Sequence, residues 1–166
     1  MRLAVSAEPS KEAVIKWIRN KIEENVKRGV KTSLLVLQNI IPHAVLRPIY
    51  WSKPELIHIF IISENPFVSE EFTTIRYGLT ELGAIITEIT ESYGKDERGG
   101  EIILADLSIL INTFGSKEVY KLILNKLGML RANGTNLIAI MHPKTHDQKI
   151  TALFKSIADN IIYIPV

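Results

Sequence analysis

Residues 101–111 read EIILADLSILI, and this stretch decides the fold class. An unbroken apolar run leads up to Asp106, without the polar alternation that marks a strand with one wet face. Such a run is typical of a strand buried on both faces, as in a parallel sheet that helices cover. Four further segments have the same character and predict strands at 33–38, 56–62, 136–141 and 160–164.

Segments with helical periodicity lie between the predicted strands. The spacing of Val14, Ile18 and Ile22 predicts a helix over about 10–28, with Ser10 as its N-cap. Further helices are predicted over 69–82, from Ser116 to about 130 and around 153–157, together with a short helix over 42–46, which Pro48 would stop, and a short strand over 84–89.

This alternation of strands and helices indicates βαβ units. We therefore expect a three-layer α/β fold, with a mainly parallel sheet of about five strands and helices on both faces. The 166 residues contain no internal repeat and no linker. They predict one domain over 1–166, with an N-terminal helix at about 10–28 and a core at about 32–164.

Composition narrows the classes of function. The chain has no cysteine, which excludes disulfides and thiolate metal sites. No apolar run reaches the roughly 18–20 residues that span a bilayer, and Glu8 and Pro9 interrupt the N-terminus before a signal peptide could form. We therefore expect a cytoplasmic protein with no membrane partner. The 26 isoleucines, against two glutamines, indicate a thermophile.

Ligands of open parallel sheets bind at the carboxyl ends of the strands. Four segments are predicted there: Gln38–Ala44, Ser63–Pro66, Asp106–Ser108 and His142–Lys149. Four histidines, at 43, 58, 142 and 146, show no recognised metal-ligand spacing, so no metal site is predicted.

Taken in order, several segments resemble the RecA-like ATPase core, closest to its KaiC and archaeal RadA-paralogue branch. EIILADLSILI resembles the Walker B strand, and IHIFIISENPF resembles the second strand with its acidic turn. GTNLIAIMHP is similar to the sensor strand and SIADNIIYI to the closing strand. The resemblance covers about 32–164. It implies that Asp106 and Ser108 stand at the Walker B position, and that Glu64 stands where the family carries its water-activating glutamate.

The chain departs from that family in its phosphate-binding loop. The family places a Gly-rich loop, G-x-x-x-x-G-K-[ST], after the first strand, where backbone amides and a lysine hold the phosphates. With the first strand at 33–38, the corresponding stretch is QNIIPHAVLRP, residues 38–48, which has no glycine, lysine, serine or threonine. β-Branched residues resist positive φ, and Pro42 lacks an N–H, so no nucleotide cofactor and no catalytic residue are predicted.

Three hypotheses follow. The first is a non-catalytic RecA/KaiC-like module that acts through protein contacts, as a regulatory or accessory subunit or as a homo-oligomer. On this interpretation Asp106 caps a local turn, Ser108 satisfies backbone groups and Glu64 is an exposed turn acid. The alternative is a nucleic-acid-binding accessory protein that uses the basic segment 117–155, with phosphate contacts from Lys144, Lys149 and Lys155. The third is an enzyme that uses Asp106 and Glu64.

Overall fold

The computed structural model describes residues 1–6 and 11–165 and contains one sheet of seven parallel strands. The strands are β1 (Arg2–Val5), β2 (Lys31–Leu37), β3 (Ile57–Ser63), β4 (Thr73–Arg76), β5 (Gly100–Leu104), β6 (Thr135–Met141) and β7 (Asn160–Tyr163). Their order across the sheet is β4-β3-β2-β5-β6-β1-β7. The expected α/β class is confirmed, but the sheet has seven strands and not five.

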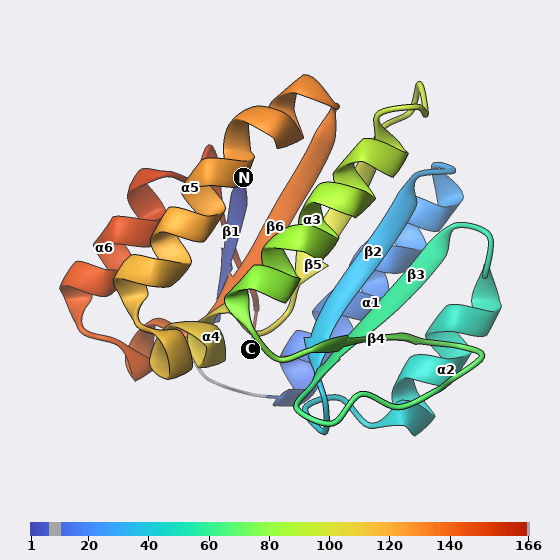
Figure 1. Ribbon diagram of the computed structural model, residues 1–166, viewed down its shortest axis with the longest axis horizontal. Coiled ribbons are helices and arrows are strands. Elements are labelled where there is room, and N and C mark those ends of the chain that lie inside the picture. Colours follow the sequence, from blue (N-terminus) through green and yellow to red (C-terminus); the bar gives the residue numbers. More distant parts are fainter. Residues whose placement is uncertain (7–10, 166) are drawn as a thin grey trace.

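Helices cover both faces of this sheet, as expected (Figure 1). Helices α1 (Lys11–Lys27) and α2 (His43–Ser52) pack on one face, and α3 (Leu79–Tyr93), α4 (Leu107–Phe114), α5 (Ser116–Ala132) and α6 (Gln148–Ser156) pack on the other. A 3₁₀ turn, η1 (Pro143–Thr145), follows β6. Each helix in the described part of the chain is too short or too polar to cross a membrane.

Two stretches near the sheet were predicted wrongly. The helix expected over 69–82 is strand β4 followed by the start of α3, and the strand expected over 84–89 lies inside α3. Residues 84–89 are helical because Leu82, Ile86 and Ile89 recur at helical spacing and are buried on one side of α3. The four residues of β4 are paired with β3, a long-range contact that local periodicity does not reveal.

Other boundaries differ in smaller ways. Helix α2 continues through Pro48 to Ser52, since burial of Leu46 and Ile49 against the sheet holds it in place. The helix expected from Ser116 has Gly115 as its N-cap and is preceded by α4, which was not predicted. The expected cap at Ser10 lies outside the described residues.

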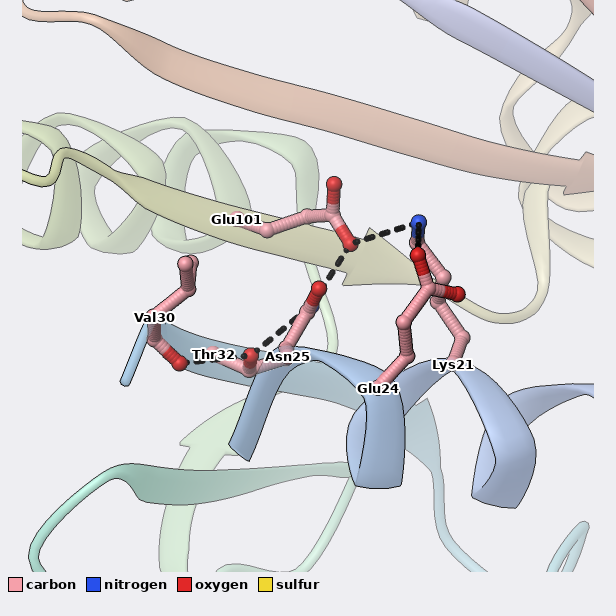
Figure 2. Close-up of polar contacts among 6 residues, drawn as sticks. All are labelled: Lys21, Glu24, Asn25, Val30, Thr32 and Glu101. Carbon is pink, nitrogen blue, oxygen red and sulfur yellow. Dashed lines mark hydrogen bonds and ion pairs between the residues drawn. The ribbon is translucent and has the colours of Figure 1, made fainter. Parts of the chain in front are cut away.

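A buried polar network ties α1 to the sheet at the amino ends of β2 and β5 (Figure 2). Glu101, the second residue of β5, is only 4% exposed. Its Oε1 accepts a hydrogen bond from Asn25 Nδ2 at 2.8 Å and lies 4.0 Å from Lys21 Nζ. Asn25 Nδ2 also donates to Thr32 Oγ1 at 3.1 Å. The carboxylate is therefore held by a helix side chain, which fixes the helix on the sheet.

Replacing Asn25 with alanine tests this network. The substitution leaves the buried Glu101 carboxylate without its closest donor, so we expect the free energy of unfolding in urea to fall by about 2 kcal/mol. Glu24→Ala is the matched control, because Glu24 contacts the same Lys21 at 3.8 Å but is exposed to solvent. This substitution should change stability by less than about 0.5 kcal/mol. Equal losses in both variants would contradict the assignment.

Candidate functional site

At the carboxyl edge of the sheet, the chain leaves the neighbouring strands β2 and β5 toward opposite faces. From β2 the chain passes to α2 on one face, and from β5 it passes to α4 on the opposite face. A crevice between strands that lead to opposite faces is where open α/β sheets bind ligands. Asp106 and Leu37 meet at this point.

Asp106 is buried at the end of β5, with 8% of its surface exposed. The last ladder bond between these strands runs from Ala105 N–H to Leu35 O at 3.0 Å. Beyond it the carboxyl of Asp106 takes over, since its Oδ2 accepts a hydrogen bond from Leu37 N–H at 2.8 Å. Asp106 is the N-cap of α4 but makes no side-chain capping bond there. The carboxyl thus caps the neighbouring strand, and the expectation that it caps the next turn is wrong.

Burial raises the pKa of Asp106 to about 6, even though the hydrogen bond from Leu37 and the nearby charge of Lys11 both favour the ionised form. The carboxyl therefore changes its protonation state close to neutral pH. Carboxyls that have a raised pKa and lie in a cleft are common at functional sites, but buried structural carboxyls also have a raised pKa.

A small cavity of about 240 Å³ lies beside this carboxyl. Three polar side chains line it, from Lys11 at the start of α1, from Asp106 and from His142 after β6. The other described residues of its wall are apolar: Val14, Ile15, Ile18, Ile40, Ile41 and Ala105. The cavity is smaller than the roughly 300–1,000 Å³ of typical small-molecule pockets.

Strand β1 changes the assignment of the loop after the first strand. The first strand is Arg2–Val5 and not the predicted 33–38, so the sequence between it and the next helix, which begins at Lys11, is 6–10. Residues 38–48 follow the second strand instead. Residues 6–12 read SAEPSKE, which also lacks glycine, although it contains a lysine. Residues 7–10 of this loop lie outside the described part of the chain.

The turn after β2 packs apolar side chains against the crevice. Asn39 adopts a positive φ of 68°, which asparagine tolerates better than most residues. The turn brings Ile40 and Ile41 to the cavity wall, and Ile41 is buried in the core on the side of α1. Space near Asp106 is thus partly occupied by isoleucine.

Ser108 connects α4 to the segment after β6. Its buried Oγ accepts a hydrogen bond from His142 N–H at 2.8 Å and lies 2.8 Å from His146 Nε2. This agrees with the interpretation that Ser108 satisfies local groups. The Nδ1 atoms of His142 and His146 are buried without a hydrogen-bond partner among the described residues. Both histidines therefore belong to a partly satisfied network.

Glu64 belongs to a different hollow, between the ends of β2 and β3. It is exposed and lines a cavity of about 350 Å³ together with Gln38 and Tyr77. Ser63, which precedes it, donates its hydroxyl hydrogen to Gln38 Oε1. Asp106 lines the other cavity, so the fold does not bring the two predicted acids to one cavity.

The three predicted phosphate contacts lie around α6. Lys144 is in the 3₁₀ turn, Lys149 is in the first turn of α6 and Lys155 is near its end. Asp147 lies between the first two, and its Oδ1 caps the helix by accepting from Lys149 N–H and Ile150 N–H at 2.9 and 3.1 Å. A carboxylate therefore interrupts this basic segment.

Sequence reasoning missed two groups at the crevice. Lys11 was placed on a helix, but the strand that brings it to the cavity was not recognised, although the apolar run LAV at 3–5 was a signal for it. His142 was named as a residue that follows a strand, but its position in the wall of this cavity was not predicted. Within 1–6 and 11–165, no three His, Asp or Glu side chains cluster in a way that could hold a metal ion.

The structure predicts how Asp106 affects stability. Because its pKa is raised from the ordinary 3.8 to about 6, its contribution to stability is fully present below 3.8 and is lost as the pH rises through about 6. At about pH 8, Asp106→Asn should therefore raise the free energy of unfolding by about 1–3 kcal/mol, because the amide oxygen can still accept from Leu37 N–H without a buried charge.

Asp106→Ala is the contrasting variant. It leaves Leu37 N–H without an acceptor, so stability should fall by about 1–3 kcal/mol at about pH 5, where the buried charge is largely absent. At about pH 8 the removal of the buried charge should offset part of this loss, so the alanine variant should stay less stable than the asparagine variant. Urea denaturation at about pH 5 and about pH 8 measures both variants. If the asparagine variant is as unstable as the alanine variant at the higher pH, the buried charge is not the cost that the geometry implies.

The two histidines should make stability depend on pH in the opposite direction to Asp106. Burial lowers the pKa of His142 and His146, and repulsion between the two rings lowers that of His146 further. Their contribution to stability is present above the ordinary value of 6.5 and is lost as the pH falls through the lowered values. Nuclear magnetic resonance titration should give midpoints below 6.5 for both rings. His146→Gln should reduce the loss of stability in acid, and an unchanged loss would contradict this.

Comparison with known proteins gives no family for this chain. No family model matches it, and no curated protein matches it. The RecA-like resemblance therefore stays a prediction, and a function has to be argued from the geometry of the carboxyl edge.

Proposed function

We propose that the protein is a non-catalytic RecA/KaiC-like module that acts through protein–protein contacts as a regulatory or accessory subunit. The observation that carries the proposal is the hydrogen bond from Leu37 N–H to the buried carboxyl of Asp106. In this position the residue that would correspond to the Walker B acid maintains the junction of β2 and β5. It serves the fold and not a ligand.

The other two residues that the RecA-like resemblance singles out, Ser108 and Glu64, support the same conclusion. Ser108 Oγ is engaged by the backbone of His142 and by the ring of His146. Glu64 lies in a separate cavity, so it has no route to a ligand shared with Asp106. An enzyme that used both acids would need them at one pocket, which this geometry does not provide.

The space at the carboxyl edge also disfavours a nucleotide. Its wall carries Ile40 and Ile41, and among residues 1–6 and 11–165 the one lysine that lines the cavity is Lys11. Both stretches that could hold phosphates, residues 6–12 and 38–48, lack glycine. A triphosphate that lost three or four charge-assisted hydrogen bonds, at about 1.5–3 kcal/mol each, would bind orders of magnitude more weakly.

Nucleic-acid binding is the less well supported alternative. Lys144 and Lys149 are exposed, but the carboxylate of Asp147 lies between them in the sequence and caps α6. A nearby negative charge weakens the attraction of a phosphate backbone. Segment 142–149 also contains no Phe, Tyr or Trp on which a base could stack.

Nucleotide binding tests the proposal directly. Isothermal titration of the protein with Mg·ATP up to about 1 mM should give no saturable heat, and phosphate release should not exceed the background. A KM in the usual enzymatic range would be detected under these conditions. Parallel titrations with single-stranded and double-stranded DNA at low salt should show no binding that salt weakens.

Two variants decide how a positive result is interpreted. Saturable Mg·ATP binding that Lys11→Ala abolishes would overturn the proposal and assign the cavity to phosphate. Lys16→Ala is the matched control, since Lys16 is an exposed lysine on the same helix that lines a different cavity. DNA binding lost in a Lys144→Ala/Lys149→Ala variant would favour the alternative function.

A further inference from the structure

Strand β7 forms one edge of the sheet and exposes apolar side chains. Within the described residues, β1 is its one neighbour in the sheet. Ile161 is 36% exposed and Tyr163 is 70% exposed, and both point to the same face because they are two residues apart. The segment from Asn160 to Ile164 carries no charge. Natural edge strands usually carry a charge or a bulge that blocks further pairing, and β7 has no charge.

The hydrogen bonds between the strands fix which backbone groups of β7 face outward. Ser6 N–H donates to Met141 O in β6, and Ile164 N–H donates to Val5 O in β1. Backbone groups of successive strand residues alternate between the two edges. Ile162 and Ile164 therefore direct their N–H and C=O groups toward β1, whereas Ile161 and Tyr163 direct theirs away from the sheet.

The opposite edge of the sheet differs in this respect. Strand β4 is also terminal in the strand order, but it includes Arg76, whereas Asp159, the charged residue next to β7, precedes the strand and pairs with the Met1 amino group and Arg131. Charges at an edge oppose the addition of another strand. The two edges are thus unequal, and β7 is the edge suited to pairing.

We propose that β7 pairs with β7 of a second copy of this chain in antiparallel orientation, about a two-fold axis at Ile162. This deepens the proposed function, on which it rests, by naming the partner as a second copy. In this register Ile161 lies opposite Tyr163 of the second copy, and each pair exchanges two backbone hydrogen bonds. The two symmetric pairs give four bonds, and the exposed groups of the edge satisfy one another.

The side chains match in the same register. Ile161 of one copy and Tyr163 of the other lie on the same face of the joined sheet. The two-fold axis produces this apolar contact twice, once on each side of Ile162. A β-branched residue opposite an aromatic one contributes about 0.2–1 kcal/mol per pair. Pro165, which follows the strand and lacks an N–H, does not extend the pairing. The interface is small, so the dimer is expected to dissociate on dilution.

A cysteine scan tests the register, because the natural chain contains no cysteine. In a non-hydrogen-bonded antiparallel pair the Cα atoms are about 4.5 Å apart, within the roughly 4.4–6.8 Å of disulfides. Ile162→Cys should therefore form a covalent dimer under mild oxidation, seen on non-reducing gels. A mixture of Ile161→Cys with Tyr163→Cys should cross-link more than either variant alone.

Val68→Cys is the control for random collisions, because Val68 is fully exposed and lies away from β7. Cross-linking of Val68→Cys as fast as that of Ile162→Cys would overturn the proposal. Light scattering at up to about 1 mM protein should show a dimer that Ile161→Lys/Tyr163→Lys converts to a monomer. A dimer that survives this change would place the interface elsewhere and leave the proposed function intact, whereas Mg·ATP binding would overturn the proposed function alone.

Discussion

The central strands of the sheet are buried on both faces, and the rest of the molecule is arranged to satisfy that constraint. Central strands such as β2 and β5 have buried residues along nearly their whole length, so helices must cover both sides. The polar groups that a buried sheet needs are then confined to the two ends of its strands. At the amino end the Asn25–Glu101 contact fixes α1, and at the carboxyl end Asp106 completes the ladder to Leu37.

The carboxyl end shows how one position can serve the fold or a reaction. Asp106 is a buried acid whose ionisation lowers the stability of the fold at neutral pH, and an amide could accept the same hydrogen bond. A purely structural requirement does not explain the choice of aspartate. The wall of the neighbouring cavity includes Ile40 and Ile41.

Burial on both faces also leaves the edges as the places where backbone groups remain available. The two edges have different chemistry, because Arg76 lies within β4 and no charged residue lies within β7. An uncharged edge with two exposed apolar side chains is self-complementary about a two-fold axis. A protein that acts through contacts and not through catalysis can use such an edge without altering its core.

The sequence by itself determined the four long central strands, the helix at 11–27 and the class of the fold, because unbroken apolar runs and three-to-four spacing are local signals. It also identified Asp106, Ser108 and His142 as residues at strand ends. Only the tertiary structure decided that Arg2–Val5 is a strand inside the sheet, that Thr73–Arg76 pairs with β3, and that Asp106 meets Leu37 while Glu64 lies elsewhere. These features depend on contacts between distant segments, and a strand of four residues carries too little pattern to reveal its partner.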